Sequence, residues 1–181
     1  VASDPLDPDL VYGGKISRFD RRTGQVLQIG PPKGPDYRAL RTAPVMFSPY
    51  DPHVLFFASN TLWKTSNGGL NWTPISPDLS RTSWEPPATV GVYRQAPTAQ
   101  FTRRGVIYAI APSSVDPNLI WAGTDDGLIH VTRTGGTNWT DVTPCARAQL
   151  FRSTSYATFR MRSSAGVQDW LHSAGVQALV P

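Results

Sequence analysis

The sequence has a single cysteine, a single glutamate and no long apolar run. One cysteine, Cys145, excludes an internal disulfide framework and a cysteine-rich zinc site. No apolar stretch approaches the ~18 residues that a membrane-spanning helix needs. The first residues have neither the basic segment nor the apolar segment of a signal peptide. Because the chain opens on Val1 rather than methionine, we expect it to be an internal piece of a larger protein.

Proline, glycine and aromatic residues are plentiful. The chain of 181 residues has 17 prolines and 15 glycines, together with six tryptophans, six tyrosines and seven phenylalanines. Proline costs about 3 kcal/mol in a helix interior, so this mixture excludes a helical bundle. It is typical of short strands that are separated by turns and packed by aromatic side chains.

The net charge of +4 is concentrated near the end of the chain. After Pro144 there are four arginines and one acid, whereas the rest of the chain has 13 basic and 12 acidic residues. A nearly neutral body without a nucleic-acid-binding motif predicts no nucleic-acid partner.

A short pattern occurs three times in the first two thirds of the chain. It consists of Asp-Pro, a polar residue, two aliphatic residues and an aromatic residue, at residues 7–12, 51–56 and 116–121. Asp-Pro favours a turn, because the carboxylate can accept backbone N–H bonds and proline fixes φ near −65°. The apolar triplet that follows predicts a short buried strand.

A second pattern follows two of these strands. Residues 65–72 and 132–139 both contain Gly-Gly and end in Asn-Trp, with a strand-like segment on either side. Segments 43–49 and 106–112 predict one more strand before the second and third Asp-Pro turns. The first unit shows no such inner strand, and its hairpin at residues 20–24 departs from the pattern.

Four short strands in each unit, with the same turns at the same places, predict the blades of a β-propeller. The predicted fold class is therefore all-β, with about two and a half four-stranded blades belonging to a larger propeller. The predicted boundaries are blades over residues 1–144, divided into a partial blade 1–34, a blade 35–80, an inter-blade loop 77–104 and a blade 105–144, followed by an atypical basic tail 145–181.

The two Gly-Gly hairpins resemble the Asp-box, the S/T-x-D-x-G-x-T-W motif of sialidase-type and sortilin-type propellers. Asn67 and Thr134 stand at the aspartate position of the motif. The resemblance implies a structural role in the turn rather than a role in ligand binding. The matching residues are Thr65, Asn67, Gly69 and Trp72 in one hairpin, and Thr132, Thr134, Gly136 and Trp139 in the other.

About four fifths of the chain is similar to the bacterial sortilin-like propeller family with BNR (Asp-box) repeats, which is often labelled glycosyl hydrolase. The segments that carry this resemblance are residues 48–52, 75–79 and 122–127. It implies a secreted or periplasmic protein with one or two propellers. The tail 145–181 departs from the family pattern, and we expect either a foreign terminus or a capping segment there.

Glycosidase chemistry generally needs two facing carboxylates, about 5–5.5 Å apart for retention or about 6.5–9.5 Å for inversion. The candidate catalytic residues are Glu85, Asp78 and Asp125, and Arg38 is a candidate arginine for a sialidase-type site. No spacing ties them together, so we interpret them as solvated loop charges. Trp84 is a candidate platform for a sugar or a peptide side chain.

The three histidines are isolated, and no phosphate loop or nucleophile motif is present, so we predict neither a metal site nor a cofactor. Two functions fit the sequence. One is a binding or scaffold module for protein, peptide or glycan ligands, and the other is part of a secreted glycoside hydrolase, sialidase-like or xyloglucanase-like, whose carboxylates lie mostly in other blades. We favour the binding module, because no catalytic pair is visible. Since an arc of blades leaves sheet faces open, we also expect contact with further blades or self-association.

Overall fold

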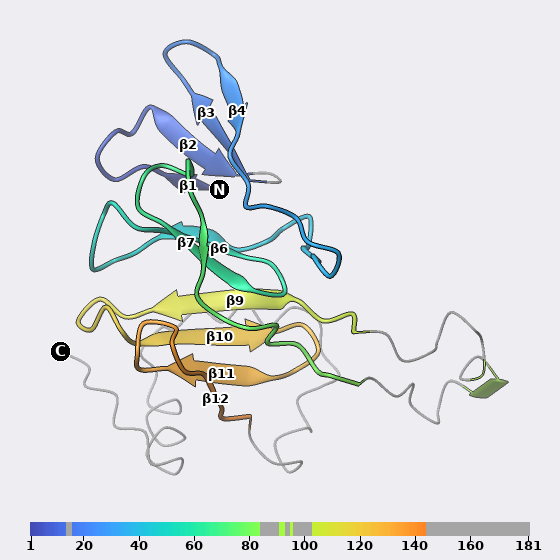
Figure 1. Cartoon of the computed structure of the whole chain (residues 1–181). Helices are drawn as coiled ribbons and strands as arrows, with labels where there is room; N and C mark the ends of the chain where they lie inside the picture. The colour runs from blue at the N-terminus through green and yellow to red at the C-terminus, as the bar shows by residue number, and fades with distance from the viewer. Residues whose placement is uncertain (14–15, 84–90, 93–94, 96–102, 144–181) are drawn as a thin grey trace. The chain divides into compact units, whose positions relative to one another are not determined.

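The computed structural model describes residues 1–13, 16–83, 91–92, 95 and 103–143. In this part of the chain the regular structure is almost entirely β, and it forms three four-stranded antiparallel sheets (Figure 1). The candidates Glu85 and Trp84, most of the predicted inter-blade loop and the tail 145–181 lie outside the described residues.

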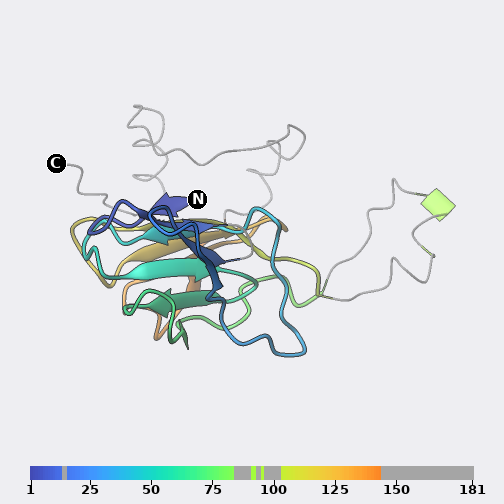
Figure 2. The same cartoon turned by 90° about the horizontal axis from the view of Figure 1, so that it is seen from above.

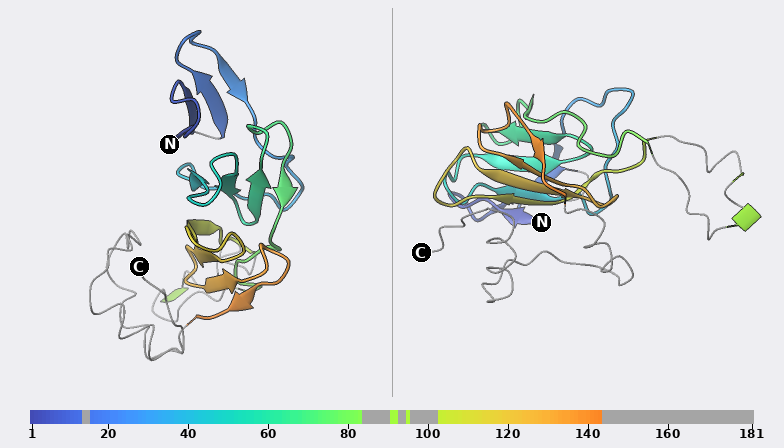
Figure 3. Two further views of the ribbon diagram at one scale, coloured as in Figure 1. Left: turned by 90° about the vertical axis from the view of Figure 1, so that its left-hand side faces the viewer. Right: turned by 90° about the horizontal axis from the view of Figure 1, so that it is seen from below.

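Each sheet is a simple meander in which strands adjacent in sequence pair with one another. Figure 3 shows the three sheets following one another in chain order, and Figure 2 shows them lying over one another when seen from above. The strands are β1 (Ala2–Ser3), β2 (Leu10–Gly13), β3 (Ser17–Asp20) and β4 (Val26–Gln28) in the first sheet, β5 (Val45–Phe47), β6 (Leu55–Ala58), β7 (Leu62–Thr65) and β8 (Thr73–Pro74) in the second, and β9 (Ile107–Pro112), β10 (Ile120–Thr124), β11 (Ile129–Thr132) and β12 (Thr140–Asp141) in the third.

The three Asp-Pro turns form as the sequence predicts. In the second and third turns the aspartate carboxylate accepts the backbone N–H two residues later, at 3.0 Å for Asp51 and 2.9 Å for Asp116. The apolar residues that follow each turn form β2, β6 and β10. All four residues of β6 are buried, because sheets pack against both of its faces.

The core consists of two apolar clusters, one at each junction between neighbouring sheets. The first includes Tyr12 and Ile29 from the first sheet with Leu55 and Phe57 from the second, and an edge-to-face contact between Tyr12 and Phe47 has ring centroids 5.3 Å apart. The second junction buries the opposite face of β6 against β9 and β10. Its buried members are Val54, Phe56, Ala58, Leu62, Leu79, Ile107, Ile120 and Ala122.

The prediction that the first unit lacks its inner strand is wrong. β1 pairs with β2 through Ala2↔Tyr12 and Ser3↔Val11, so the first sheet also has four strands. The strand was missed because it is only two residues long and contains no apolar run. The hairpin at residues 20–24, which departs from the Gly-Gly pattern, is closed by a different side chain. The Asp20 carboxylate accepts the Arg22 N–H there at 2.8 Å.

The all-β propeller-blade prediction is confirmed by these three sheets. Alternation of antiparallel strands places the β6–β7 and β10–β11 loops and the links between sheets at one end, which we call the loop end. The Asp-Pro turns and the last hairpin of each sheet lie at the opposite end, the hairpin end. Within the part of the chain that the structure describes, no helix has the length and apolar character to cross a membrane.

Candidate functional site

A polar network centred on Asp78 occupies the loop end. The Oδ2 atom of Asp78 accepts hydrogen bonds from Arg38 Nη2 at 2.5 Å and Asn60 Nδ2 at 3.1 Å. Its Oδ1 atom accepts the N–H and the hydroxyl of Ser80 at 3.0 and 2.6 Å. Arg103 adds a second ion pair at 3.3 Å. Because its side chain is only 14% exposed, Asp78 is a largely buried and fully partnered carboxylate.

The environment favours the ionised form of Asp78. Burial by itself raises the pKa of a carboxyl group, but the hydrogen bonds from Ser80, Arg38 and Asn60 outweigh it, so the pKa of Asp78 lies below its ordinary value. A general acid needs the opposite shift, because it must hold a proton at the working pH. Asp78 is therefore an anion that is held in place.

Arg38 joins three segments that are distant in sequence. It lies in the link between the first and second sheets, and its backbone makes two hydrogen bonds with Asn60 of the β6–β7 loop. Arg38 N–H donates to the side-chain oxygen Asn60 Oδ1 at 3.0 Å, and Asn60 N–H donates to the Arg38 carbonyl at 2.8 Å. Its guanidinium also donates to the Gly105 carbonyl at 3.3 Å, just before β9. The interpretation of Arg38 and Asp78 as solvated loop charges is therefore wrong, since their side chains are only 22% and 14% exposed.

The β10–β11 loop of the third sheet repeats this arrangement with carboxylates. Asp125 Oδ1 accepts the Val106 N–H at 2.8 Å, and Asp126 Oδ2 accepts the Arg81 N–H at 2.7 Å. The Arg81 Nε–H in turn donates to the Asp126 carbonyl at 2.9 Å. Asp125, a predicted catalytic candidate, therefore holds the residue before β9 against the β10–β11 loop.

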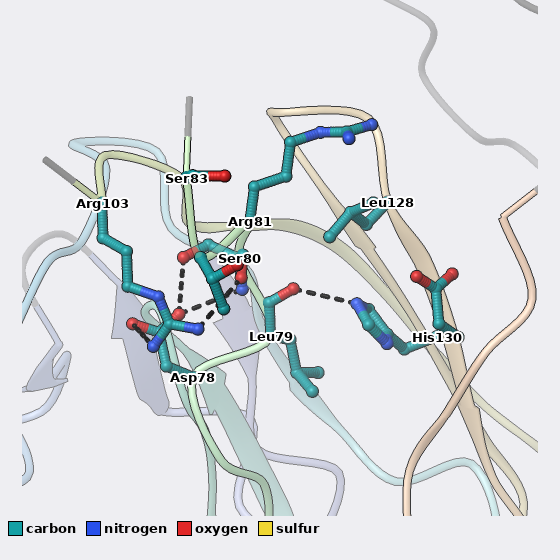
Figure 4. Close-up of a pocket in the computed structure, with 10 residues that line it drawn as sticks. Asp78, Leu79, Ser80, Arg81, Ser83, Arg103, Leu128 and His130 are labelled. Carbon is teal, nitrogen blue, oxygen red and sulfur yellow. Dashed lines mark hydrogen bonds and ion pairs between the residues drawn. The ribbon is translucent and has the colours of Figure 1, made fainter. Parts of the chain in front are cut away.

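A pocket of about 400 Å³ opens beside this network, between the link that leaves the second sheet and the outer strands of the third (Figure 4). In Figure 4 the Arg81 side chain extends away from the segment at Asp78–Ser83, whereas the Arg103 side chain, from the residues before β9, reaches toward Asp78. The lining is polar except for two leucines. The lining residues are Asp78, Leu79, Ser80, Arg81, Thr82, Ser83, Arg103, Leu128, His130 and Asp141.

A histidine and a second carboxylate line the pocket on the side of the third sheet. His130 Nε2 lies 2.9 Å from the Leu79 carbonyl, which fixes the ring against the link from the second sheet. Asp141 is the cross-strand partner of His130, and its Oδ1 accepts the Thr143 N–H at 2.8 Å. Burial acts to raise the pKa of Asp141, but the bonds from Thr143 and the nearby His130 and Arg81 outweigh it, and the pKa is lowered.

The first Gly-Gly hairpin lies away from the pocket, at the hairpin end. Thr65 Oγ1 accepts the Gly69 N–H at 3.2 Å, and Asn67 Oδ1 accepts the Asn71 N–H at 3.0 Å. Gly69 has φ of 89°, which a residue with a side chain adopts only under strain. These side chains are engaged with the turn itself.

The second hairpin makes the same bonds with one different side chain. Thr132 Oγ1 accepts the Gly136 N–H at 3.0 Å, and Thr134 Oγ1 accepts the Asn138 N–H at 2.9 Å. The hydroxyl of Thr134 therefore supplies the bond that the amide oxygen of Asn67 supplies in the other hairpin. Trp72 and Trp139 point out of their hairpins and donate to backbone carbonyls of the preceding sheet, Ile29 O and Ile75 O.

Among the predicted candidates that the structure describes, Asp78 alone lines the pocket. Sequence reasoning missed Arg81, in the link after the second sheet, and His130 and Asp141, in the third sheet, which span 60 residues of the sequence. A usable signal was the position of His130 on an outer strand next to a loop with two aspartates. Among the described residues, no group of three or more His, Cys, Asp or Glu side chains is placed to hold a metal ion.

Comparisons with known proteins give likeness in structure only. No protein-family model matches the chain, and no curated protein matches it either. Among solved structures, the chain is similar to a GH74 xyloglucanase from Xanthomonas campestris, with 20% identity, a TM-score of 0.47, and coverage of 78% of this chain and 22% of that one. It is also similar to a GH74 enzyme from Niastella koreensis, with 20% identity, a TM-score of 0.42, and coverage of 79% and 22%.

A third solved structure is YCF48 bound to D1 peptide, with 11% identity and a TM-score of 0.25 over 73% of this chain and 63% of that one. The chain thus spans less than a quarter of the two GH74 proteins and less than two thirds of YCF48.

Proposed function

We propose that these blades form a binding module that takes a polar ligand, a glycan or a peptide, in the pocket between the second and third sheets. The observation that supports this function is the pocket itself. It lies at the loop end, is lined by hydroxyl, guanidinium and imidazole groups, and is set on a link that the Asp78 network holds in place. Fixed polar groups around an open cavity suit recognition, because little conformational freedom is lost when a ligand binds.

A second candidate function is part of a glycoside hydrolase, because two carboxylates, Asp78 and Asp141, line the same pocket. A glycosidase of either stereochemistry needs one carboxyl group that is still protonated at the working pH. The pKa values of Asp78 and Asp141 are both lowered, so both groups are anions at neutral pH. This argues against catalysis by this pair and leaves binding as the better account.

The same proposal places the module outside the cytoplasm, as part of a sortilin-like, Asp-box propeller protein. Its support is the resemblance of the two hairpins, whose turns are closed by Thr65 and Thr132 in the same way. Fractionation of cells that express the intact gene tests the location. Recovery of the protein only in the cytoplasmic fraction would refute it.

The binding test fills the pocket with a side chain. Ser83 is exposed and lines the pocket, so Ser83→Trp adds an indole there. Ser114 is also exposed but lies in the β9–β10 turn at the hairpin end, and Ser114→Trp is the matched control. Calorimetric titration uses neutral and acidic polysaccharide fragments and a panel of unstructured peptides. We expect a ligand that binds the wild type and the control but is weakened at least about tenfold by Ser83→Trp. Equal binding by all three proteins would refute the pocket as the site.

The catalytic alternative is tested on the same proteins. Polysaccharides and chromogenic glycosides are incubated with wild type, Asp141→Asn, and Asp116→Asn as an exposed control outside the pocket. We expect no turnover. Turnover that Asp141→Asn abolishes and Asp116→Asn leaves intact would establish the hydrolase and overturn a purely binding role.

A further inference from the structure

The junction between the first and second sheets is closed by a tryptophan and a glycine of the first Gly-Gly hairpin. Trp72 Nε1 donates to the Ile29 carbonyl, which follows the last strand of the first sheet. Gly69 lies directly on the Ile29 side chain, and a Cβ atom at Gly69 would lie 2.8 Å from Ile29 Cβ. The hairpin can approach this closely only because the residue is glycine.

The junction between the second and third sheets repeats this contact. Trp139 Nε1 donates to the Ile75 carbonyl at 2.8 Å. A Cβ atom at Gly136 would lie 2.7 Å from Ile75 Cβ. Two successive junctions with the same donor, the same acceptor position and the same close glycine define a docking rule for this protein.

The third sheet carries the acceptor position of this rule. In the second sheet the N–H of Ile75 donates to the Leu62 carbonyl at 2.8 Å, and in the third sheet the N–H of Val142 donates to the Ile129 carbonyl at 2.8 Å. Val142 therefore occupies the position of Ile75, three residues after the hairpin tryptophan. Among the sheets that the structure describes, the third has a neighbouring sheet on one face only (Figure 3).

Apolar side chains surround this acceptor on the third sheet. By the Asp-Pro repeat Trp121 matches Phe56, and by the backbone bond Ile129 matches Leu62. Phe56 and Leu62 are buried against the next sheet, at 4% and 0% exposure, whereas Trp121 and Ile129 remain half-buried. The face thus has the same type of residue at the same positions as the covered face of the second sheet.

The first sheet lacks the hairpin tryptophan that donates the hydrogen bond at the other two junctions. Counting back three residues from Ile29 gives Val26, where the other hairpins have tryptophan, and the side chain is 62% exposed. Phe19, paired with Val26, stands where the other hairpins have threonine, and it is 39% exposed. A second copy of this chain therefore presents no tryptophan of this kind at its first sheet.

We propose that the outer face of the third sheet docks a four-stranded blade of another polypeptide segment, one whose last hairpin carries the Thr-x-x-x-Gly-x-x-Trp pattern. The tryptophan of that blade donates to the Val142 carbonyl, its glycine lies on the Val142 side chain, and its apolar face covers Trp121 and Ile129. Two occupants were expected for an open blade face, a further blade and a second copy of this chain. A further blade fits the face, whereas an unmodified second copy does not, because its first sheet lacks the tryptophan donor.

The test supplies the missing donor on the chain itself. In the graft variant, residues 19–26 of the full chain are replaced by the equally long sequence of residues 65–72, which puts tryptophan at position 26. Sedimentation equilibrium compares it with wild type. A head-to-tail contact pairs two different faces, so each added chain leaves a face open for the next one until a ring closes. We therefore expect oligomers, with association at least about tenfold stronger than that of wild type. Adding Trp121→Arg to the graft removes this gain, whereas Val115→Arg, at a 74% exposed turn residue, preserves it.

Circular dichroism and Trp fluorescence first establish that each variant is folded. Wild-type chains that associate as strongly as the graft, and lose association with Trp121→Arg, would assign the face to a second copy and overturn the proposal. A folded graft variant that sediments like wild type would also overturn it. In that case, increased proteolysis within residues 145–181 on Trp121→Arg would assign the face to that segment of the chain.

Discussion

Replacement of Asp78 by alanine is the most direct test of the loop-end network. The substitution removes the acceptor of five contacts, from Arg38, Asn60, Arg103 and both donors of Ser80. Arg38 keeps its bonds to the Asp36 and Gly105 carbonyls, so its charge is not left without any partner. We therefore expect a loss of about 2–4 kcal/mol in the free energy of unfolding, between that of a charged hydrogen bond and that of a broken buried ion pair.

Urea unfolding at pH 7, followed by tryptophan fluorescence, measures this loss. The matched control is Asp116→Ala, because the exposed Asp116 accepts a single bond from the Asn118 N–H at 2.9 Å. The control should cost about 0.5–1 kcal/mol. If Asp78→Ala costs no more than the control, the Asp78 network does not stabilise the link between the sheets.

The difference between wild type and Asp78→Asn should also depend on pH in one direction. The pKa of Asp78 is lowered in the folded protein, so its ionised form stabilises the fold fully above the unfolded-state pKa of about 4. This stability is lost as the pH falls through the lower folded-state pKa. Unfolding measured from pH 7 down to the acid limit should show the two proteins converging below about pH 4. A difference that stays constant over this range would contradict the assignment.

Two further substitutions test close contacts. Gly105→Ala should destabilise the protein by about 1–3 kcal/mol in urea unfolding, because its Cβ would collide with the Asp126 carboxylate, whereas Gly34→Ala, with open space around it, should be nearly neutral. Equal effects would refute the collision. Trp139→Phe should cost about 1 kcal/mol or more, because it leaves the Ile75 carbonyl without its indole donor, and an unchanged midpoint would show that this bond does not contribute.

Repetition is what made the fold predictable. The Asp-Pro turn, the apolar triplet and the Gly-Gly hairpin each depend on residues close in sequence, such as Asp116 and Asn118 or Thr65 and Gly69. These local signals locate β6, β7, β10 and β11. The strand at Ala2–Ser3 has no such signal, because its place is decided by pairing with β2 rather than by its own residues.

The candidate site was less predictable, because its contacts are distant in sequence. Asp78 was identified as a carboxylate outside the turns, but its main partner, Arg38, lies 40 residues earlier. Which loops meet depends on how the sheets stack, and the sequence pattern of a single blade does not contain that information. The same holds for His130, whose contact with the Leu79 carbonyl spans 51 residues.

The two ends of the sheets are held together by different interactions, and this difference argues against Asp78 as a catalytic acid. At the hairpin end, Trp139 and its glycine fix one sheet to the next through backbone contacts that leave little freedom for change. At the loop end, the same task is performed by charged groups around Asp78, which remain partly accessible from a pocket. A carboxylate used in this way cannot also carry a proton at neutral pH, so it cannot serve as the acid of a glycosidase. Recognition needs no proton donor, and it benefits from the rigidity that this network gives to the neighbouring hydroxyl and guanidinium groups.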